Sequence, residues 1–81
     1  MKAKITITLK NGVHDPQGEA TLGTLKHLGF NDVGAVRVGK YIELELNGVS
    51  KEEAQKEVDT MCRKLLANPV IESYHIELGA S

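Results

Sequence analysis

The sequence predicts an α+β fold, a two-layer sandwich of order β-α-β-β-α-β in which two helices cover one face of an antiparallel sheet. Apolar and polar residues alternate over residues 3–10, over residues 33–46 and again near the C-terminus, which is the period of half-buried strands. Between these stretches, Asp15-Pro16 and Ser50–Glu53 are helix-start signals. The alternating stretches therefore predict the sheet, and the two start signals predict the helices.

The first strand and the first helix are separated by a short turn. Along the strand, Ile5, Ile7 and Leu9 lie on one face, and Asn11-Gly12 ends the alternation. Asp15 is expected to cap the helix, with Pro16 at the first helical position. The helix carries a narrow apolar stripe of Leu22, Leu25 and Leu28, and Gly29-Phe30 is expected to end it in a Schellman motif.

The next stretch, residues 33–46, alternates throughout and predicts a hairpin that turns near Gly39-Lys40. Ser50 and Glu53 then form a capping box at the start of the second helix. We expect this helix to end near Ala67, before Pro69. Its apolar face is predicted to comprise Ala54, Val58, Met61, Cys62, Leu65 and Leu66.

The sheet face that the helices leave open is predicted to carry a mixed set of side chains: Thr6, Thr8, Ala35, Arg37, Tyr41, Glu43, Ile71, Ser73 and His75. This mixture is less strongly polar than a fully solvated surface. The open face therefore indicates docking to a second subunit, and so a homodimer or a higher homo-oligomer.

Composition limits the class of protein. The 81 residues predict a single domain, 1–81, with a small core. The net charge is -1, and the chain has one Phe, two Tyr and no Trp, so we expect no nucleic-acid partner. No stretch is long and apolar enough to cross a membrane, and the N-terminus lacks the apolar core of a signal peptide. The lone cysteine fits a reducing cytoplasm.

Catalytic and ligand-binding chemistry is not predicted for this chain. His14, His27 and His75 lack metal-ligand spacing, so we expect surface or edge positions for them. Cys62 lies on an apolar helix face, near the wrong end of its helix for an activated thiolate, and is expected to be a core residue. The sequence therefore predicts no catalytic, cofactor-binding or metal-binding residue.

Five residues are candidates for contacts with other subunits. Asp15 and Gln17 belong to the turn Asp15–Gly18, which is either a plain helix cap or a helix N-terminus that presents N–H groups to an anion. Arg37 and Lys40 are either solvated cations or interface anchors. Tyr41 is expected on the open sheet face.

Three blocks of sequence carry a resemblance to a known family: Leu9–Val13 with Asp15–Gly18; Leu28–Phe30 with Val36–Lys40 and Glu43-Leu44; and Met61–Tyr74. In order and spacing they resemble the PurS family, the small subunit of phosphoribosylformylglycinamidine synthase (formylglycinamide ribonucleotide amidotransferase). The third block is the most specific of the three. The resemblance implies a cytoplasmic, dimerising subunit without catalytic residues, which joins a large synthetase subunit and a glutaminase subunit in purine biosynthesis.

The resemblance also implies the reaction of the whole assembly, an ATP-dependent C–N ligase. Formylglycinamide ribonucleotide (FGAR), ATP and glutamine become formylglycinamidine ribonucleotide (FGAM), ADP, phosphate and glutamate. ATP and Mg²⁺ would be held by the large subunit and no cofactor by this chain, which would bridge its partners and support ammonia transfer.

The same topology also allows other classes of protein. A small-molecule-binding regulatory module of ferredoxin-like topology is the main alternative. An acylphosphatase-like enzyme would need an arginine in a phosphate cradle after the first strand, and Asn11–His14 supplies none. An RNA-binding domain would need aromatic residues on the sheet and positive charge.

Overall fold

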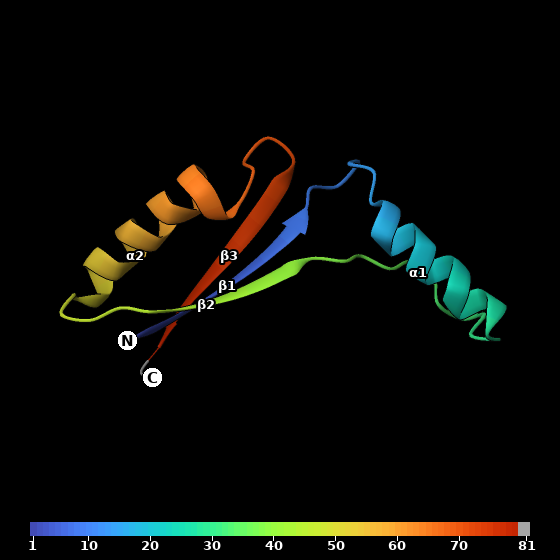
Figure 1. The fold of residues 1–81 in the computed structure, drawn as a ribbon, viewed down its shortest axis with the longest axis horizontal. Helices are drawn as coiled ribbons and strands as arrows, with labels where there is room; N and C mark the ends of the chain where they lie inside the picture. The colour runs from blue at the N-terminus through green and yellow to red at the C-terminus, as the bar shows by residue number, and fades with distance from the viewer. Residues whose placement is uncertain (80–81) are drawn as a thin grey trace.

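The computed structural model describes residues 1–79, so residues 80 and 81 of the predicted domain lie outside the described part. The elements in chain order are β1 (Lys2–Leu9), α1 (Pro16–His27), β2 (Lys40–Glu45), α2 (Lys51–Met61), the π-helical turn η1 (Cys62–Leu66) and β3 (Glu72–Gly79). Within this range the strands form one sheet of order β2-β1-β3, with both pairings antiparallel (Figure 1). The predicted α+β class with an antiparallel sheet is confirmed.

The core lies between the sheet and α2. β1 is the central strand, and the predicted alternation along it is confirmed, because Ile5 and Ile7 are fully buried while Thr6 between them is exposed. Across the interface, Val58 and Cys62 are fully buried as well. One face of the sheet and one face of α2 therefore exclude water together, as the hydrophobic effect favours.

The second helix starts as predicted but ends differently. The Ser50 hydroxyl accepts a hydrogen bond from the backbone N–H of Glu53 at 3.2 Å. At the other end, the N–H of Ala67 bonds the carbonyl of Cys62 at 2.9 Å, a π-type hydrogen bond that adds a residue to the turn. The extra residue rotates the following side chains, so Leu65 is 82% exposed and its predicted place on the apolar face was wrong.

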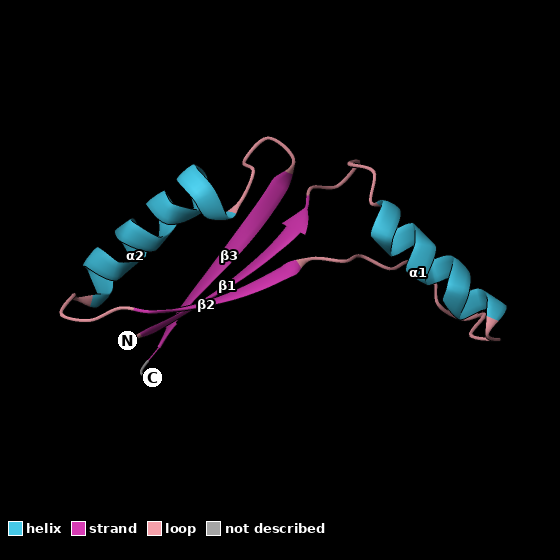
Figure 2. Ribbon diagram, viewed as in Figure 1, coloured by secondary structure: helices cyan, strands magenta, loops and turns pink. Residues whose placement is uncertain are grey.

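The predicted hairpin over residues 33–46 is wrong in its first half. Only Lys40–Glu45 forms a strand, and residues 33–39 pair with no strand of the described chain. Figure 2 shows this segment as a long loop that connects the end of α1 to β2. Alternation predicts side-chain exposure, but a β-ladder also needs a partner strand within reach.

Helix α1 does not lie on the sheet, so the prediction of two helices on one face was also wrong. Figure 1 shows α1 projecting away from the sheet, with the α2 helix on the opposite side of the molecule. The Cα radius of gyration is 16.1 Å, whereas a compact chain of this length would have about 12 Å. We call α1 and the returning segment, residues 16–39, the arm, and the remaining described residues the body.

The width of the sheet explains why only one helix packs on it. Strands lie about 4.8 Å apart, so three of them present a face roughly 10–15 Å wide. A helix with its side chains is about 10–12 Å in diameter, and α2 alone covers such a face. The apolar stripe of α1 is narrow, and no residue of α1 except Gly18 is buried. The face that α2 covers therefore has no room for a second helix, and α1 has no large apolar surface that would hold it against the other, more polar face of the sheet.

Candidate subunit-interface site

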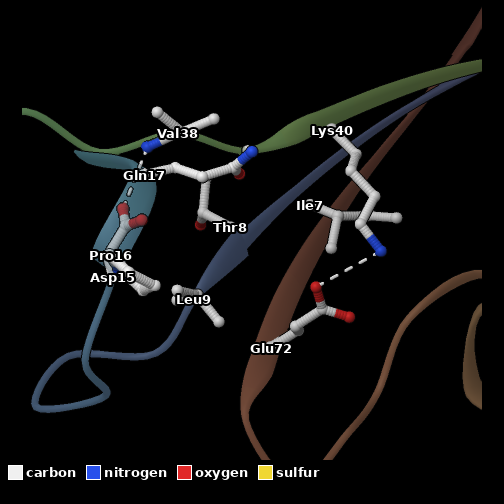
Figure 3. A pocket seen from close by; sticks show the side chains of 10 residues that line it. Ile7, Thr8, Leu9, Asp15, Pro16, Gln17, Val38, Lys40 and Glu72 are labelled. Atoms are coloured by element: carbon white, nitrogen blue, oxygen red, sulfur yellow. Dashed lines mark hydrogen bonds and ion pairs between the residues drawn. The ribbon is translucent and has the colours of Figure 1, made fainter. Parts of the chain in front are cut away.

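The arm joins the body through Asp15. One carboxylate oxygen of Asp15 accepts a hydrogen bond from the Gly18 N–H at 2.9 Å, which is the predicted helix cap. The other oxygen accepts one from the Val38 N–H at 3.0 Å, as the dashed line in Figure 3 shows. These two backbone hydrogen bonds are the main reason why the pKa of Asp15 is lowered. Asp15 therefore links the outgoing and the returning segments of the arm.

Two of the candidate cations lie at the same junction. The Arg37 guanidinium donates a hydrogen bond to the backbone carbonyl of Leu9, the last residue of β1. The Lys40 ammonium lies 3.5 Å from a carboxylate oxygen of Glu72, at the start of β3. Both side chains contact the body of their own chain, and Lys40 remains more than half exposed. Each of them can still offer part of its charge to a partner.

A pocket of about 260 Å³ opens at this junction. Figure 3 shows Asp15 and Gln17 on one side of it and the Lys40–Glu72 pair with Ile7 on the other, and Leu9 lies between the two sides. The structure thus brings Asp15, Gln17 and Lys40 together. A pocket of this small volume, with an apolar floor and charged rims, suits a side chain of a partner better than a large substrate.

Tyr41 lies apart from this junction. It is opposite Thr6 in the sheet, on the face that α2 leaves open, and it is 57% exposed. Burial and the neighbouring Glu43 raise the pKa of its hydroxyl. Beside it, Lys2 and Glu43 form an ion pair at 3.0 Å. Ala35 and Ile71, the apolar residues expected on this face, do not belong to a strand, and neither does Arg37. Because the face carries the Lys2–Glu43 ion pair and lacks these two apolar residues, it is more polar than predicted.

The arm carries apolar side chains that were not among the predicted interface residues. Leu28 is 65% exposed and Phe30 is 54% exposed. The predicted Schellman motif is confirmed, since the Phe30 N–H bonds the Leu25 carbonyl at 3.0 Å and Gly29 has a φ of 103°. The motif places Phe30, but its exposure follows from the position of α1, which the residue pattern did not predict.

The reactive side chains of the described residues have structural surroundings. Cys62 is fully buried, and burial raises the pKa of its thiol. Among residues 1–79, no cluster of His, Cys, Asp and Glu has the geometry to hold a metal ion. No helix in this part of the chain is long and apolar enough to cross a membrane. Together, the fold, the junction pocket and the exposed side chains of the arm define a class of protein: a small α+β module with a projecting, partly apolar arm.

Comparison with known proteins identifies the family. The family model of PurS, phosphoribosylformylglycinamidine (FGAM) synthase, matches residues 2–80. The PurS subunit of this synthase from Archaeoglobus fulgidus is 50% identical over 76 residues, which are 94% of this chain and 95% of the relative. The chain therefore belongs to the PurS family.

Solved structures agree with this assignment. PurS from Methanocaldococcus jannaschii, one of the subunits of formylglycinamide ribonucleotide amidotransferase in the purine biosynthetic pathway, superposes with a TM-score of 0.88. It is 41% identical, and the match covers 99% of this chain and 96% of that one. A chain of PurLQS from Thermotoga maritima superposes with a TM-score of 0.85 at 36% identity, over 94% of this chain and 93% of that one. The match gives no support to the regulatory module that the topology also allowed.

Proposed function

We propose that this chain is the small, non-catalytic subunit of phosphoribosylformylglycinamidine synthase in purine biosynthesis. It bridges the large synthetase subunit and the glutaminase subunit and supports the transfer of ammonia from glutamine. The assembly converts FGAR, ATP and glutamine to FGAM, ADP, phosphate and glutamate. The observation that carries this proposal is the whole-length match to PurS subunits, together with the likeness to a chain of PurLQS.

The physical features of the chain support a role in association. The arm exposes Leu28 and Phe30 to water, and burying apolar surface against a partner is favourable by about 25 cal/mol per Å². Residues 33–39 pair with no strand of the described chain, so this extended segment can offer backbone groups to a partner subunit. We propose that a second copy of the chain and the two larger subunits cover the arm and the junction.

The candidate interface residues keep their proposed role in a sharper form. Gln17 and Lys40 border the junction pocket, and Tyr41 is exposed on the open face. Asp15 and Arg37 hold the arm to the body, and we propose that they act on partners through that geometry. Co-purification of Gln17→Ala, Lys40→Ala and Tyr41→Ala variants with the two larger subunits tests direct contact. Undiminished assembly in all three would remove these residues from the interface.

The chain alone is proposed to be inactive, with ATP and Mg²⁺ bound by the synthetase subunit and the whole assembly in the cytoplasm. Support comes from the engaged state of its reactive groups. Cys62 is enclosed in the core, Asp15 is occupied by two backbone N–H groups, and Glu72 is bonded by the Asn68 N–H at 2.7 Å. Groups held in this way are poor nucleophiles or bases.

The decisive experiment measures FGAM formation by the synthetase and glutaminase subunits with and without this chain. One series uses glutamine as the nitrogen source and a matched series uses an ammonium salt. We expect glutamine-dependent turnover to require the chain and ammonia-dependent turnover to proceed without it. Equal glutamine-dependent rates with and without the chain, and no co-elution of the three subunits, would contradict the proposal.

A further inference from the structure

Asp15 does more than cap a helix. An N-cap needs one side-chain acceptor for the free N–H groups of the first turn, as Ser50 provides for α2. Asp15 provides that acceptor to Gly18 and then uses its second oxygen for Val38, which is 23 residues further along the chain. One short side chain therefore joins the segment that enters the arm to the segment that leaves it.

Two glycines bring these segments close enough for the link. A Cβ atom built on Gly18 would lie 2.3 Å from the Val36 carbonyl oxygen. One built on Gly39 would lie 2.4 Å from the Ile7 carbonyl oxygen. Both distances are well below van der Waals contact, and both neighbours are backbone atoms. The base of the arm is therefore packed backbone against backbone, with the Asp15 carboxylate bridging it.

The rest of the arm lacks such anchors. Beyond Gly18, the residues of α1 are half-buried or exposed, and the arm projects from the body (Figure 1). Within one copy of the described chain, the arm is held to the body only at its base, by Asp15 and by the hydrogen bond of Arg37 to Leu9, because nothing further along α1 is packed tightly. We propose that Asp15 is a positioning residue, which sets the direction of the arm by linking the Gly18 and Val38 backbones.

A fixed direction has a consequence for association. A surface that is already held in its bound geometry loses less conformational freedom when a partner docks. In the proposed function, the arm would meet its partners in an orientation prepared by Asp15. This second step relies on the proposed function, whereas the effect of Asp15 on the arm can be measured on the isolated chain.

The experiment measures the distance between the arm and the body with two spin labels. Lys26→Cys on α1 and Gln55→Cys on α2 are exposed label sites, and Cys62 is left in place because it is fully buried. Labelled chain is diluted with unlabelled chain, so that dipolar spectroscopy reads distances within one molecule. The distance distribution is compared among the parent chain, Asp15→Ser and Ser50→Ala.

Asp15→Ser separates the two tasks of the residue. Serine is a good N-cap, but its single hydroxyl cannot serve Gly18 and also reach Val38. Ser50→Ala is the matched control, since it removes the cap of the other helix without touching the junction. We expect a broader and displaced distance distribution for Asp15→Ser and an unchanged one for Ser50→Ala.

An unchanged distribution in a folded Asp15→Ser chain would overturn the proposal. Asp15→Asn is the second variant, in case serine prevents folding. Asparagine replaces one of the two carboxylate oxygens by an NH2 donor, so in the observed geometry either the Gly18 or the Val38 N–H loses its acceptor, and the same broadening is expected. If the parent chain fails to join the synthetase and glutaminase subunits, the proposed function fails, while the spin-label result still decides the role of Asp15.

Discussion

The body and the arm solve the problem of apolar surface in opposite ways. In the body, a strand with period two and a helix with period 3.6 bury Ile5, Ile7, Val58 and Cys62 completely. In the arm, an equally regular helix buries only Gly18 and leaves Phe30 more than half exposed. The body thus contains the hydrophobic core, whereas the arm is a regular element whose exposed apolar side chains have no partner within the described chain.

The contrast shows that a helix can be regular and well capped without being buried. Helix α1 has a proline at its first position, an aspartate cap and a Schellman motif at its end. These devices satisfy the backbone at both ends and stabilise the helix by local terms. They allow α1 to persist beside solvent, which is what an element that awaits a partner requires.

Truncating one apolar side chain in each region should give the largest difference between the body and the arm in the free energy of unfolding. We expect Ile5→Ala to lower the free energy of unfolding by about 2–5 kcal/mol, because it opens a cavity in a filled core. Leu22→Ala in the arm should cost about 1 kcal/mol, because that side chain is only half-buried. Urea unfolding of both variants measures the difference. Equal losses would mean that the arm is part of the cooperative core.

When association is measured instead of stability, a substitution in the arm should have a larger effect than one in the body. Phe30→Glu removes an exposed aromatic ring, so the stability of the isolated chain should hardly change. Aromatic anchors carry much of the energy of interfaces, and the association constant should fall by more than about tenfold. Sedimentation velocity of the chain alone and with its partner subunits reports this loss.

The control for Phe30→Glu is Gln55→Glu, which adds the same charge to the exposed side of α2 in the body. It should leave association unchanged at moderate salt, where exposed charges are screened. A similar loss in both variants would indicate a general charge effect, and the arm would no longer be distinguished from the body as a contact surface.

Replacing two glycines of α1 by alanine should change the stability of the chain in opposite directions. At Gly18 the new Cβ would press on the Val36 carbonyl, and overpacking of this kind costs about 1–3 kcal/mol. At Gly23 no atom lies within 4 Å of the new Cβ, so the variant should gain about 1 kcal/mol from the higher helix propensity of alanine. Thermal unfolding of both variants reads the two signs. A stabilised Gly18→Ala chain would mean that the junction is loose.

Much of the local structure of both the body and the arm could be predicted from residue patterns. The caps at Asp15 and Ser50, the stop at Gly29 and the alternation along β1 depend on neighbours in the sequence, and all four are confirmed. The three matching blocks also indicate the family from the sequence alone. Local physical chemistry determines these features, so they can be recognised in a single chain.

The rest depends on long-range partners that residue patterns do not name. Val36 and Val38 alternate as in a strand, yet no strand pairs with them within the described chain. Leu65 has the spacing of a core residue, yet the π-type turn rotates it outward. At the junction, the cap at Asp15 was predictable, but its second bond to Val38 joins residues that only the folded arm brings together. The interface candidates themselves remain predictions.

The smallest expected effect is a pH-dependent difference in stability, and it concerns the junction where the arm and the body meet. The pKa of Asp15 is lowered by the Gly18 and Val38 N–H groups, with smaller contributions from Arg37 and His14 that face it. A lowered folded-state pKa stabilises the fold above the ordinary pKa of an aspartate, and this contribution disappears as the pH falls through the lowered value.

The melting temperature of the parent chain should therefore exceed that of Asp15→Asn at neutral pH. The gap should narrow as the solution becomes acidic, since the parent carboxylate is then protonated. The Lys2–Glu43 pair titrates in the same direction, but it is present in both chains and cancels in the difference. A gap that stays constant down to the acid limit of folding would show that the negative charge of Asp15 does not hold the arm to the body.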